Sequence, residues 1–348
     1  MEREDTPRES PPARLQPFGL DTTILPKLPC SPAVIPEMQL SLLSAEAKEE
    51  FNPLSTALTE RIHKLILAGQ TDVAVAAASQ LCVLRPHSPK AHAVLYQARI
   101  SAGDREGAYA AHQTVIDLVA AAIDMSARPL SLQERMSVFG QFIFLGGPKE
   151  QFEKIGKLQL RVLLNNGLRP DHKVLDIGCG CLRAGVHIME VLNPGNYCGL
   201  EPNTNMLKFG KTHVVGPAGM VAARPNFDNN LEFDFTPFQT TFDFFVARSI
   251  WTHASKPQIE SMLDGFLATA APDAVFLASF YPALDDEDDY TESGWTGRSE
   301  SSCIGGWIRH SPIWIARACV ERGLRMCQDE DAPIENGQVW LRITRATT

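Results

Sequence analysis

The 348-residue chain lacks a cluster of basic residues interleaved with aromatic ones. It has 32 Lys and Arg against 41 Asp and Glu, a formal net charge of −9, and 8% aromatic residues. Binding to a nucleic-acid backbone needs clustered basic side chains. The composition therefore argues against a nucleic-acid partner.

A long apolar run is missing as well. No segment approaches the roughly 20 apolar residues that span a bilayer, and residues 1–12 are charged and contain proline, without the apolar core of a signal peptide. The eight cysteines are scattered, and no Cys or His pair stands at metal-site spacing. We expect no membrane partner, no metal site, no disulfide framework and a cytoplasmic location.

Composition divides the chain into four parts. Residues 1–38 are rich in proline and are expected to form a flexible leader. Residues 39–125 are rich in Ala and Leu at helical spacing, and residues 126–150 are expected to form a linker or lid helix within about 130–144. Residues 151–348 alternate strand and helix patterns, which predicts an α/β domain.

The helical region contains an internal repeat. Ala68-Gly69-Gln70 recurs as Ala102-Gly103-Asp104, and Ala74 recurs as Ala108, each at an offset of 34 residues. This is the period of the tetratricopeptide helix–turn–helix, and we expect each glycine to end the first helix of a pair. The region resembles a short tetratricopeptide array of about two repeats, with an unrelated Ala-rich helical hairpin as the alternative. Such an arm would act as a spacer, form a homodimer, or dock a protein partner.

The stretch from His172 to Glu201 carries the strongest functional signal. In order it contains the apolar run Lys173–Ile177, the glycines Gly178 and Gly180, helical spacing over Leu182–Leu192, a second apolar run Tyr197–Leu200, and then Glu201. The pattern predicts a strand, a glycine turn, a helix and a second strand with an acidic tip. Such a unit holds a nucleoside at the carboxyl ends of parallel strands.

Two details argue against a dinucleotide at this turn. The pattern G-x-G-x-x-G requires a glycine where this chain has Arg183. Asp176 lies at the mouth of the turn, where its carboxylate would repel a pyrophosphate on the helix N-terminus. It would suit a ligand with an ammonium group, and Glu201 could accept hydrogen bonds from ribose hydroxyls.

At these residues the chain resembles the class I S-adenosylmethionine-dependent methyltransferases. V-L-D-I-G-C-G (174–180) is similar to their first motif and Y-C-G-L-E-P (197–202) to their acidic second motif, although Leu182 replaces the usual third glycine. The resemblance covers roughly Gln151 to Arg345. It implies S-adenosyl-L-methionine as cofactor and an α/β fold with a seven-stranded, doubly wound, Rossmann-like sheet that closes with an antiparallel hairpin.

The remaining elements are expected in the order of such a sheet. The predicted strands are Leu231–Phe235, Phe242–Ala247, Ala274–Phe280, Leu324–Gln328 and Gln338–Thr344, with helices at Lys256–Ala268 and Pro312–Arg322. The cofactor-binding residues that follow are Asp176, Gly178, Gly180, Glu201, Pro202, Asn203 and, near adenine, Asp234 or Phe235. Arg248 and Ser249 are expected to line the cleft near the transferred methyl group.

Residues that could catalyse the reaction are marked less clearly in the sequence than the cofactor-binding residues. This is expected for methyl transfer from a sulfonium. The methyl group is already activated, so the protein mainly orients the acceptor, and a base is needed only if the acceptor must lose a proton. His253, just beyond the fourth predicted strand, is the best acid–base candidate, with packing against the next helix as the alternative. Tyr281 and His310 are weaker candidates.

Two segments could cover the site. The polar insertion from Asp285 to His310 is longer than an ordinary connection, so we expect an acceptor-site lid with Trp295 and Trp307 as apolar contacts. Its acidic run D-D-E-D-D is expected to be solvated, or to favour a basic acceptor if it is functional. Residues 135–148 are a second candidate lid.

The sequence therefore predicts S-adenosylmethionine-dependent methyl transfer to a small-molecule acceptor by in-line displacement. One alternative is a methyltransferase for a peptide or protein that the helical repeats dock. Another is a non-catalytic scaffold that retains the fold. The acceptor atom is not encoded in any motif of the chain.

Overall fold

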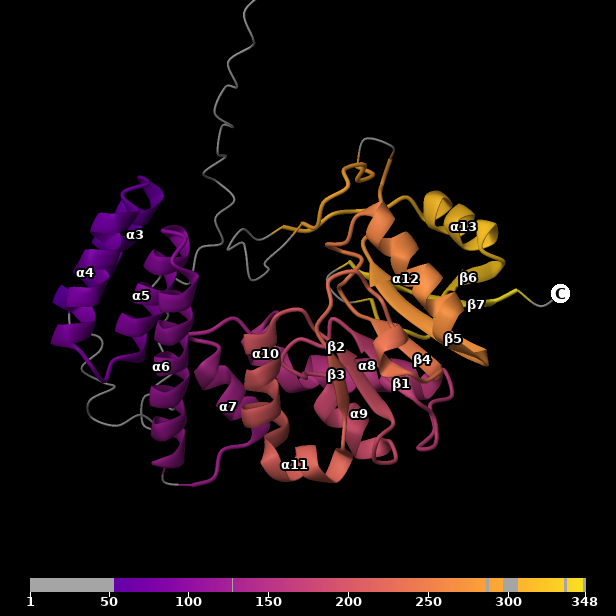
Figure 1. The fold of residues 1–348 in the computed structure, drawn as a ribbon, viewed down its shortest axis with the longest axis horizontal. Coiled ribbons are helices and arrows are strands. Elements are labelled where there is room, and N and C mark those ends of the chain that lie inside the picture. The colour runs from indigo at the N-terminus through magenta and orange to yellow at the C-terminus, as the bar shows by residue number, and fades with distance from the viewer. Residues whose placement is uncertain (1–52, 127, 286–287, 297–305, 335–336, 347–348) are drawn as a thin grey trace, which may run out of the picture.

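A computed structural model describes residues 53–126, 128–285, 288–296, 306–334 and 337–346. The predicted leader at residues 1–38 lies outside them. Helices α3 to α6 stand on one side of the molecule and an α/β domain on the other, with α7 and α10 between them (Figure 1). Among the described residues, no helix is both long enough and apolar enough to cross a membrane.

The helical arm consists of two helix pairs. They are α3 (Pro53–Leu67) with α4 (Thr71–Leu84), and α5 (Pro89–Ser101) with α6 (Arg105–Asp124). Ala74, Ala78 and Ala98 are fully buried where these helices meet. Small side chains let helix axes approach closely, which explains the Ala-rich composition of the region.

Two glycine turns of the helical arm, 34 residues apart, have the same backbone conformation. Gly69 and Gly103 have φ of +71° and +77°, and in both turns the amide of the next residue donates to a carbonyl five residues back at 2.9 Å. This is the same left-handed helix ending made twice. His63 and Gln97, which are also 34 residues apart, join the two pairs through a 3.0 Å hydrogen bond. The relation to tetratricopeptide arrays stays a prediction.

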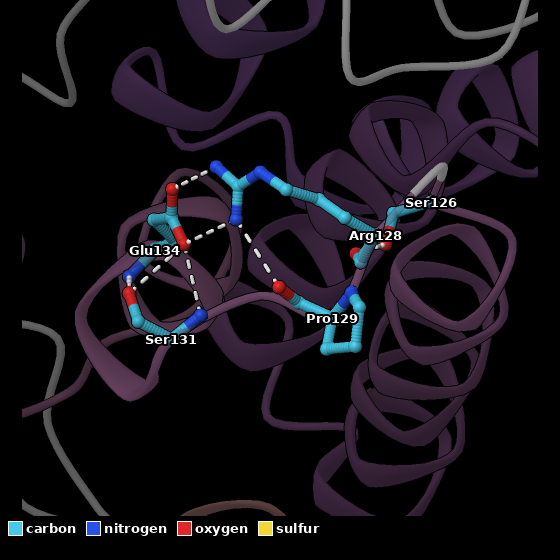
Figure 2. Close-up of polar contacts among 5 residues, drawn as sticks. All are labelled: Ser126, Arg128, Pro129, Ser131 and Glu134. Atoms are coloured by element: carbon cyan, nitrogen blue, oxygen red, sulfur yellow. Dashed lines mark hydrogen bonds and ion pairs between the residues drawn. The ribbon is translucent and has the colours of Figure 1, made fainter.

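The start of α7 (Leu132–Phe139) is fixed by a small polar network (Figure 2). Arg128 donates to both carboxylate oxygens of Glu134, and the Ser131 amide donates to the same carboxylate at 2.8 Å. The hydrogen bond from Arg128, followed by those from Ser131, lowers the pKa of Glu134 to about 2. Ser131 and Glu134 thus form a capping box that sets where the chain turns after α6.

An apolar cluster joins the arm to the α/β domain. Val115, Ile116 and Val119 of α6 pack in one cluster with Phe139 of α7 and Phe209 of α10 (Thr204–Phe209). The Phe139 and Phe209 rings meet edge to face at 4.9 Å. Helix α6 is therefore part of the domain's core and not an independent appendage.

The α/β domain is built on one seven-stranded sheet. Its strands are β1 (Val174–Ile177), β2 (Tyr197–Leu200), β3 (Asn226–Asp228), β4 (Phe242–Ala247), β5 (Ala270–Phe280), β6 (Leu324–Gln328) and β7 (Val339–Arg345). Their order is β3-β2-β1-β4-β5-β7-β6, and β7 runs antiparallel to both of its neighbours. The order reverses between β1 and β4, the switch point where such sheets bind ligands. The predicted closing hairpin is confirmed.

Helices cover both faces of the sheet. Leu175 and Phe245 belong to a core with α12 (Lys256–Thr269) and α13 (Pro312–Glu321), whereas Val174 and Val246 belong to a core with α8 (Phe152–Asn165) and α9 (Gly185–Val191). Alternate residues of a strand face opposite sides, so the apolar runs of the central strands supply both cores. The short 3₁₀ turns η2 (Lys149–Gln151) and η4 (Thr236–Phe238) complete the domain.

The third strand is the one element that was predicted wrongly. Residues 231–235 form a loop in which Leu231 is 69% exposed and Phe233 has a φ of +57°. The strand comes earlier because α11 (Gly216–Ala223) ends at Arg224 in a left-handed conformation, and the chain pairs with β2 directly afterwards. The apolar pattern of 231–235 instead places Phe235 in the core.

Gly156 of α8 provides a test of this packing. A Cβ there would lie 2.2 Å from the carbonyl oxygen of Arg183. Glycine to alanine in a helix normally stabilises by up to ~1 kcal/mol, but here the overlap should make Gly156→Ala less stable than the wild type by about 1–3 kcal/mol. Denaturant unfolding measures the difference.

Gly294→Ala is the matched control, because no atom lies within 4 Å of its Cβ position. Equal or greater stability of Gly156→Ala would contradict the close contact between α8 and the start of α9.

Candidate functional site

The turn after β1 is built from left-handed residues. Gly178, Gly180 and Leu182 have φ of +69°, +56° and +63°. Leu182 stands at the position of the family's third glycine and keeps the backbone conformation of a glycine, at a cost of order 1 kcal/mol. A Cβ at Gly178 would lie 2.1 Å from Cδ1 of Ile250, so the tip of β4 closes directly onto this turn.

Glu201, at the carboxyl end of β2, is tied to this turn. Its carboxylate is 9% exposed and accepts from the Gly180 amide and from the Asn203 amide, each at 2.8 Å. An ionised carboxylate only accepts hydrogen bonds and offers about four positions for them. The same group can therefore hold the turn and accept from ligand hydroxyls.

Asp176 lies behind the turn, where it accepts a 2.7 Å hydrogen bond from the Tyr197 hydroxyl. Burial raises the pKa of Asp176 to about 7, with the Tyr197 hydrogen bond opposing the rise and the nearby Glu201 adding to it. Tyr197 also lies against the start of α9, because a Cβ at Gly185 would be 2.5 Å from its hydroxyl oxygen. Tyr197 was not predicted, since a tyrosine at the start of an apolar strand looks like a core residue.

Asn203 and the helix it begins complete this side of the turn. The Asn203 side chain accepts from the Met206 amide at 2.8 Å and so caps α10 directly after Pro202. Helix α10 continues into η3 (Gly210–Val215), a π-helical turn, and a Cβ at Gly210 would lie 2.6 Å from the Cys181 backbone. Such turns are rare and are often found at functional sites.

Asp234 and Phe235 do not lie at the tip of β3. Asp234 is exposed and accepts from the Thr236 amide and hydroxyl, whereas Phe235 is fully buried against Phe245. The carboxyl end of β3 is instead formed by residues 228–230. The Asp228 side chain there accepts from the Asn230 amide at 2.9 Å.

The tip of β4 carries a neutral polar cluster. Ser249, which follows Arg248, has a φ of +57°, and its amide donates to the Ser279 hydroxyl at 2.8 Å. The hydroxyls of Ser249 and Ser279 lie 2.9 and 2.8 Å from Oε1 of buried Gln338. Gln338 was missed because it comes from the far end of the chain and enters this edge only through the antiparallel β7.

The predicted acid–base residues lie in different surroundings. His253 is partly buried, and its Nδ1 lies 2.7 Å from the Thr296 carbonyl. Burial lowers the pKa of His253, and hydrogen bonds with the Thr296 and Gly306 backbone oppose this shift. Tyr281 follows β5 with the Arg309 guanidinium 5.7 Å from its ring centre. His310 is fully buried, and its Nε2 lies 2.9 Å from the Ala254 carbonyl.

The acidic run at 285–289 was expected to be solvated; Asp285 is exposed, whereas Asp288 and Asp289 are partly buried in ion pairs. Asp289 pairs with Lys256 at 2.7 Å and also accepts from the Ser311 amide, and Asp288 pairs with Arg309 at 3.2 Å. These ion pairs fasten the insertion to the start of α12. The carboxylates of Asp288 and Asp289 are thus paired within the chain.

The second candidate lid, residues 135–148, touches the turn itself. The Leu145 carbonyl accepts from Arg183 at 2.7 Å, and the Cys181 thiol lies 3.5 Å from the same oxygen. The polar insertion covers the β4–α12 connection instead, through hydrogen bonds from the Ile308 amide to the Thr252 carbonyl and from the Thr296 amide to the His253 carbonyl. Residues 135–148 therefore lie over the turn after β1, and the polar insertion lies over the connection between β4 and α12, both at the carboxyl ends of the parallel strands.

No family model matches the chain. Among solved structures, it is similar to DhpI in complex with S-adenosylhomocysteine (15% identity, 62% of this chain and 94% of that chain, TM-score 0.43). It is also similar to the glycopeptide N-methyltransferase MtfA with S-adenosylmethionine (14%, 55% and 94%, 0.41) and to magnesium protoporphyrin IX methyltransferase from Synechocystis PCC 6803 (12%, 64% and 87%, 0.42). At these identities and TM-scores the likeness adds nothing to what the strand order already shows.

The buried Asp176 predicts a pH dependence of stability. Its folded pKa of about 7 lies above the ordinary value of 3.8. Between these values the unfolded chain is ionised and the folded protein is not, so the unfolding free energy of the wild type should fall as pH rises from about 4 to about 7. Relative to Asp176→Asn, the fall should be on the order of a few kcal/mol in denaturant titrations.

Tyr197→Phe removes the hydrogen bond that lowers the pKa of Asp176. In this variant the unfolding free energy should therefore continue to fall to a higher pH. Parallel pH profiles for the wild type and Asp176→Asn would contradict the assignment.

Proposed function

We propose that this chain is an S-adenosyl-L-methionine-dependent methyltransferase that acts on a small-molecule acceptor. The observation that carries the proposal is the buried Glu201 carboxylate hydrogen-bonded to the Gly180 amide at the switch point of the sheet. This hydrogen bond joins the acidic tip of β2 to the glycine turn after β1. These are the two features in which the sequence resembles the class I methyltransferases.

The residues present fit this cofactor by their chemistry. Glu201 provides acceptors for two ribose hydroxyls, and Gly178 and Gly180 leave their backbones open to the methionine part. Pro202 and Asn203 flank the adenosine. Residues 228–230, which follow β3, take the adenine-side role in place of Asp234 and Phe235.

When bound, the cofactor supplies a methyl group that is already electrophilic, so the chain's task is to orient the acceptor. Arg248 and Ser249 line the methyl-transfer side, and the strained Ser249 is held by Ser279 and Gln338. His253 and Tyr281 are the candidates to take a proton if the acceptor must lose one.

The packing of the arm favours a small acceptor over a docked peptide. Helix α6 shares an apolar cluster with Phe139 and Phe209, which gives the arm a structural function within the domain. Removing residues 1–125 would expose this cluster, so a deletion would not test docking alone.

Removal of the Glu201 carboxylate tests the proposal. Hydrogen bonds to charged groups contribute about 1.5–3 kcal/mol each, so losing two in Glu201→Ala should weaken S-adenosylhomocysteine binding by at least about a hundredfold. 5′-Methylthioadenosine keeps the ribose and should lose a similar factor. Isothermal calorimetry on the full chain measures both.

The control is Glu190→Ala, which removes an exposed carboxylate of α9. Failure of the wild-type protein to bind either S-adenosylmethionine or S-adenosylhomocysteine would reject a methyl-donor site and favour the scaffold alternative.

A further inference from the structure

The seven-stranded sheet ends in an open strand edge at β6. Among the described strands, β6 is the last in the sheet order and pairs with β7, and the strand at the opposite edge, β3, has three residues. An open edge presents backbone donors and acceptors with which another strand can pair, so native proteins usually cover or block it. Strand β6 and helix α13 lie at the end of the molecule opposite to the helical arm (Figure 1). A partner bound at this edge would therefore lie far from the arm.

The pairing of β6 with β7 shows which backbone groups face the open edge. The Asp329 amide, directly after β6, donates to the Trp340 carbonyl at 2.9 Å. In an antiparallel pair the hydrogen-bonded positions alternate along each strand, so the odd-numbered residues of β6 bond toward β7. The even-numbered residues Leu324, Met326 and Gln328 direct their N–H and C=O groups away from β7.

An apolar hollow borders this edge on the side of α13. Its volume is about 360 Å³, and its lining includes Ala316 and Val320 of α13 and Leu324 and Met326 of β6. Leu324 and Met326 also pack in the core with α13. Val320 is 71% exposed and Ile313 is 74% exposed. Residues three and four apart lie on one side of a helix, so Ile313, Ala316 and Val320 form an exposed apolar stripe beside the edge.

The other face of β6 carries charges that complement each other across a two-fold axis. Alternate residues of a strand face opposite sides, so Arg325, Cys327 and Asp329 face away from α13. Arg325 and Cys327 are exposed, and Asp329 is partly exposed. The Asp329 carboxylate accepts from the Asn166 side chain at 2.7 Å and has further acceptor positions.

Two copies of β6 can pair antiparallel about a two-fold axis at Cys327. Arg325 of each copy then stands opposite Asp329 of the other, and the axis makes this pair twice. Opposite charges directly across a strand pair are stabilising. The same register pairs Met326 with Gln328 of the other copy through the backbone groups that face the open edge. The charges and the backbone therefore favour one arrangement.

We propose that β6 pairs with β6 of a second copy of this chain, so that the two sheets join into one across a two-fold axis. On one face the apolar stripe of α13 packs against its own copy over the hollow. On the other face the Arg325–Asp329 pairs close the interface. This dimer contact does not depend on the proposed function.

Gln328→Pro tests the backbone pairing. Proline removes an N–H that points away from β7, so the β6–β7 pairing loses no hydrogen bond. Two hydrogen bonds between the copies are lost, and dimerisation should weaken at least about tenfold. Gln328→Ala is the matched control and should dimerise within about twofold of the wild type. Sedimentation equilibrium of the full chain over a range of concentrations measures the association.

A wild-type protein that stays monomeric at every concentration would overturn the proposal. Equal association of Gln328→Pro and Gln328→Ala would overturn it as well, because the dimer would then form through another surface.

Arg325→Asp tests the charge pairing. It places like charges opposite each other at both Asp329 positions, so dimerisation should weaken about tenfold. Arg161→Asp makes the same change at an exposed arginine of α8 and should alter the association by less than about twofold. Equal association of these two variants would contradict the register.

A measurement on the wild type needs no variant to fold. In the proposed register Cys327 faces its own copy in a non-hydrogen-bonded pair, where Cα atoms lie about 4.5 Å apart, within the range that a disulfide spans. The Cys327 thiol is free and exposed. Mild oxidation with copper phenanthroline should therefore link two chains on a non-reducing gel, and Cys327→Ser should stay unlinked.

A dimer without a link that depends on Cys327 would overturn the proposal. A monomer in which Cys327 resists alkylation by a maleimide would also overturn it, and would show that another segment of the chain covers the edge.

Discussion

The hydrogen bond from the Gly180 amide to the Glu201 carboxylate is the contact on which the rest of the candidate site depends. The turn contains three left-handed residues within five positions and has few side chains of its own to hold it. A charge-assisted hydrogen bond at 2.8 Å from the neighbouring strand supplies that constraint. Because β1 and β2 are adjacent in the sheet, their register sets the distance over which this bond forms.

Several tight contacts are arranged around this fixed turn. Gly210 packs on the Cys181 backbone, Gly156 on the Arg183 carbonyl, and Ile250 on Gly178, each too close for an additional Cβ. These contacts come from η3, α8 and the tip of β4. The turn is thus closely packed on three sides. Binding sites supported in this way keep their geometry without a ligand.

The sequence predicted the central strands well and the peripheral contacts poorly, for a physical reason. Tyr197–Leu200 and Phe242–Ala247 agree with the structure at both ends because buried parallel strands are short continuous apolar runs. Strand β3, Asn226–Asp228, is a polar edge strand formed by backbone pairing, so no side-chain pattern marks it. Leu231–Phe235 has an apolar pattern, but it forms a loop in which only Phe235 is fully buried and Phe233 packs partly buried against the core.

The same reason separates the predicted site residues from the missed ones. Glu201 lies at a strand tip and the glycines lie in the adjoining turn, and a short local motif encodes both positions. Gln338 meets Ser249 across 89 positions, and Lys256 meets Asp289 across 33. Such partners depend on the folded topology. The pairing of Asp288 and Asp289 and the burial of His310 were for this reason not predicted.

Helix α10 is one of the elements that link the helical arm to the glycine turn. Helix α10 begins two residues after Glu201, carries Met206 against the turn, and packs Phe209 against α6 and α7. A hollow of about 170 Å³ remains between α6 and this helix, next to His112 and Lys208. If α6 shifted, the elements that border it would have to move as well, and α10 is one of them. Since Asn203 caps α10 and its amide donates to Glu201, a shift of α10 would reach the Glu201 carboxylate.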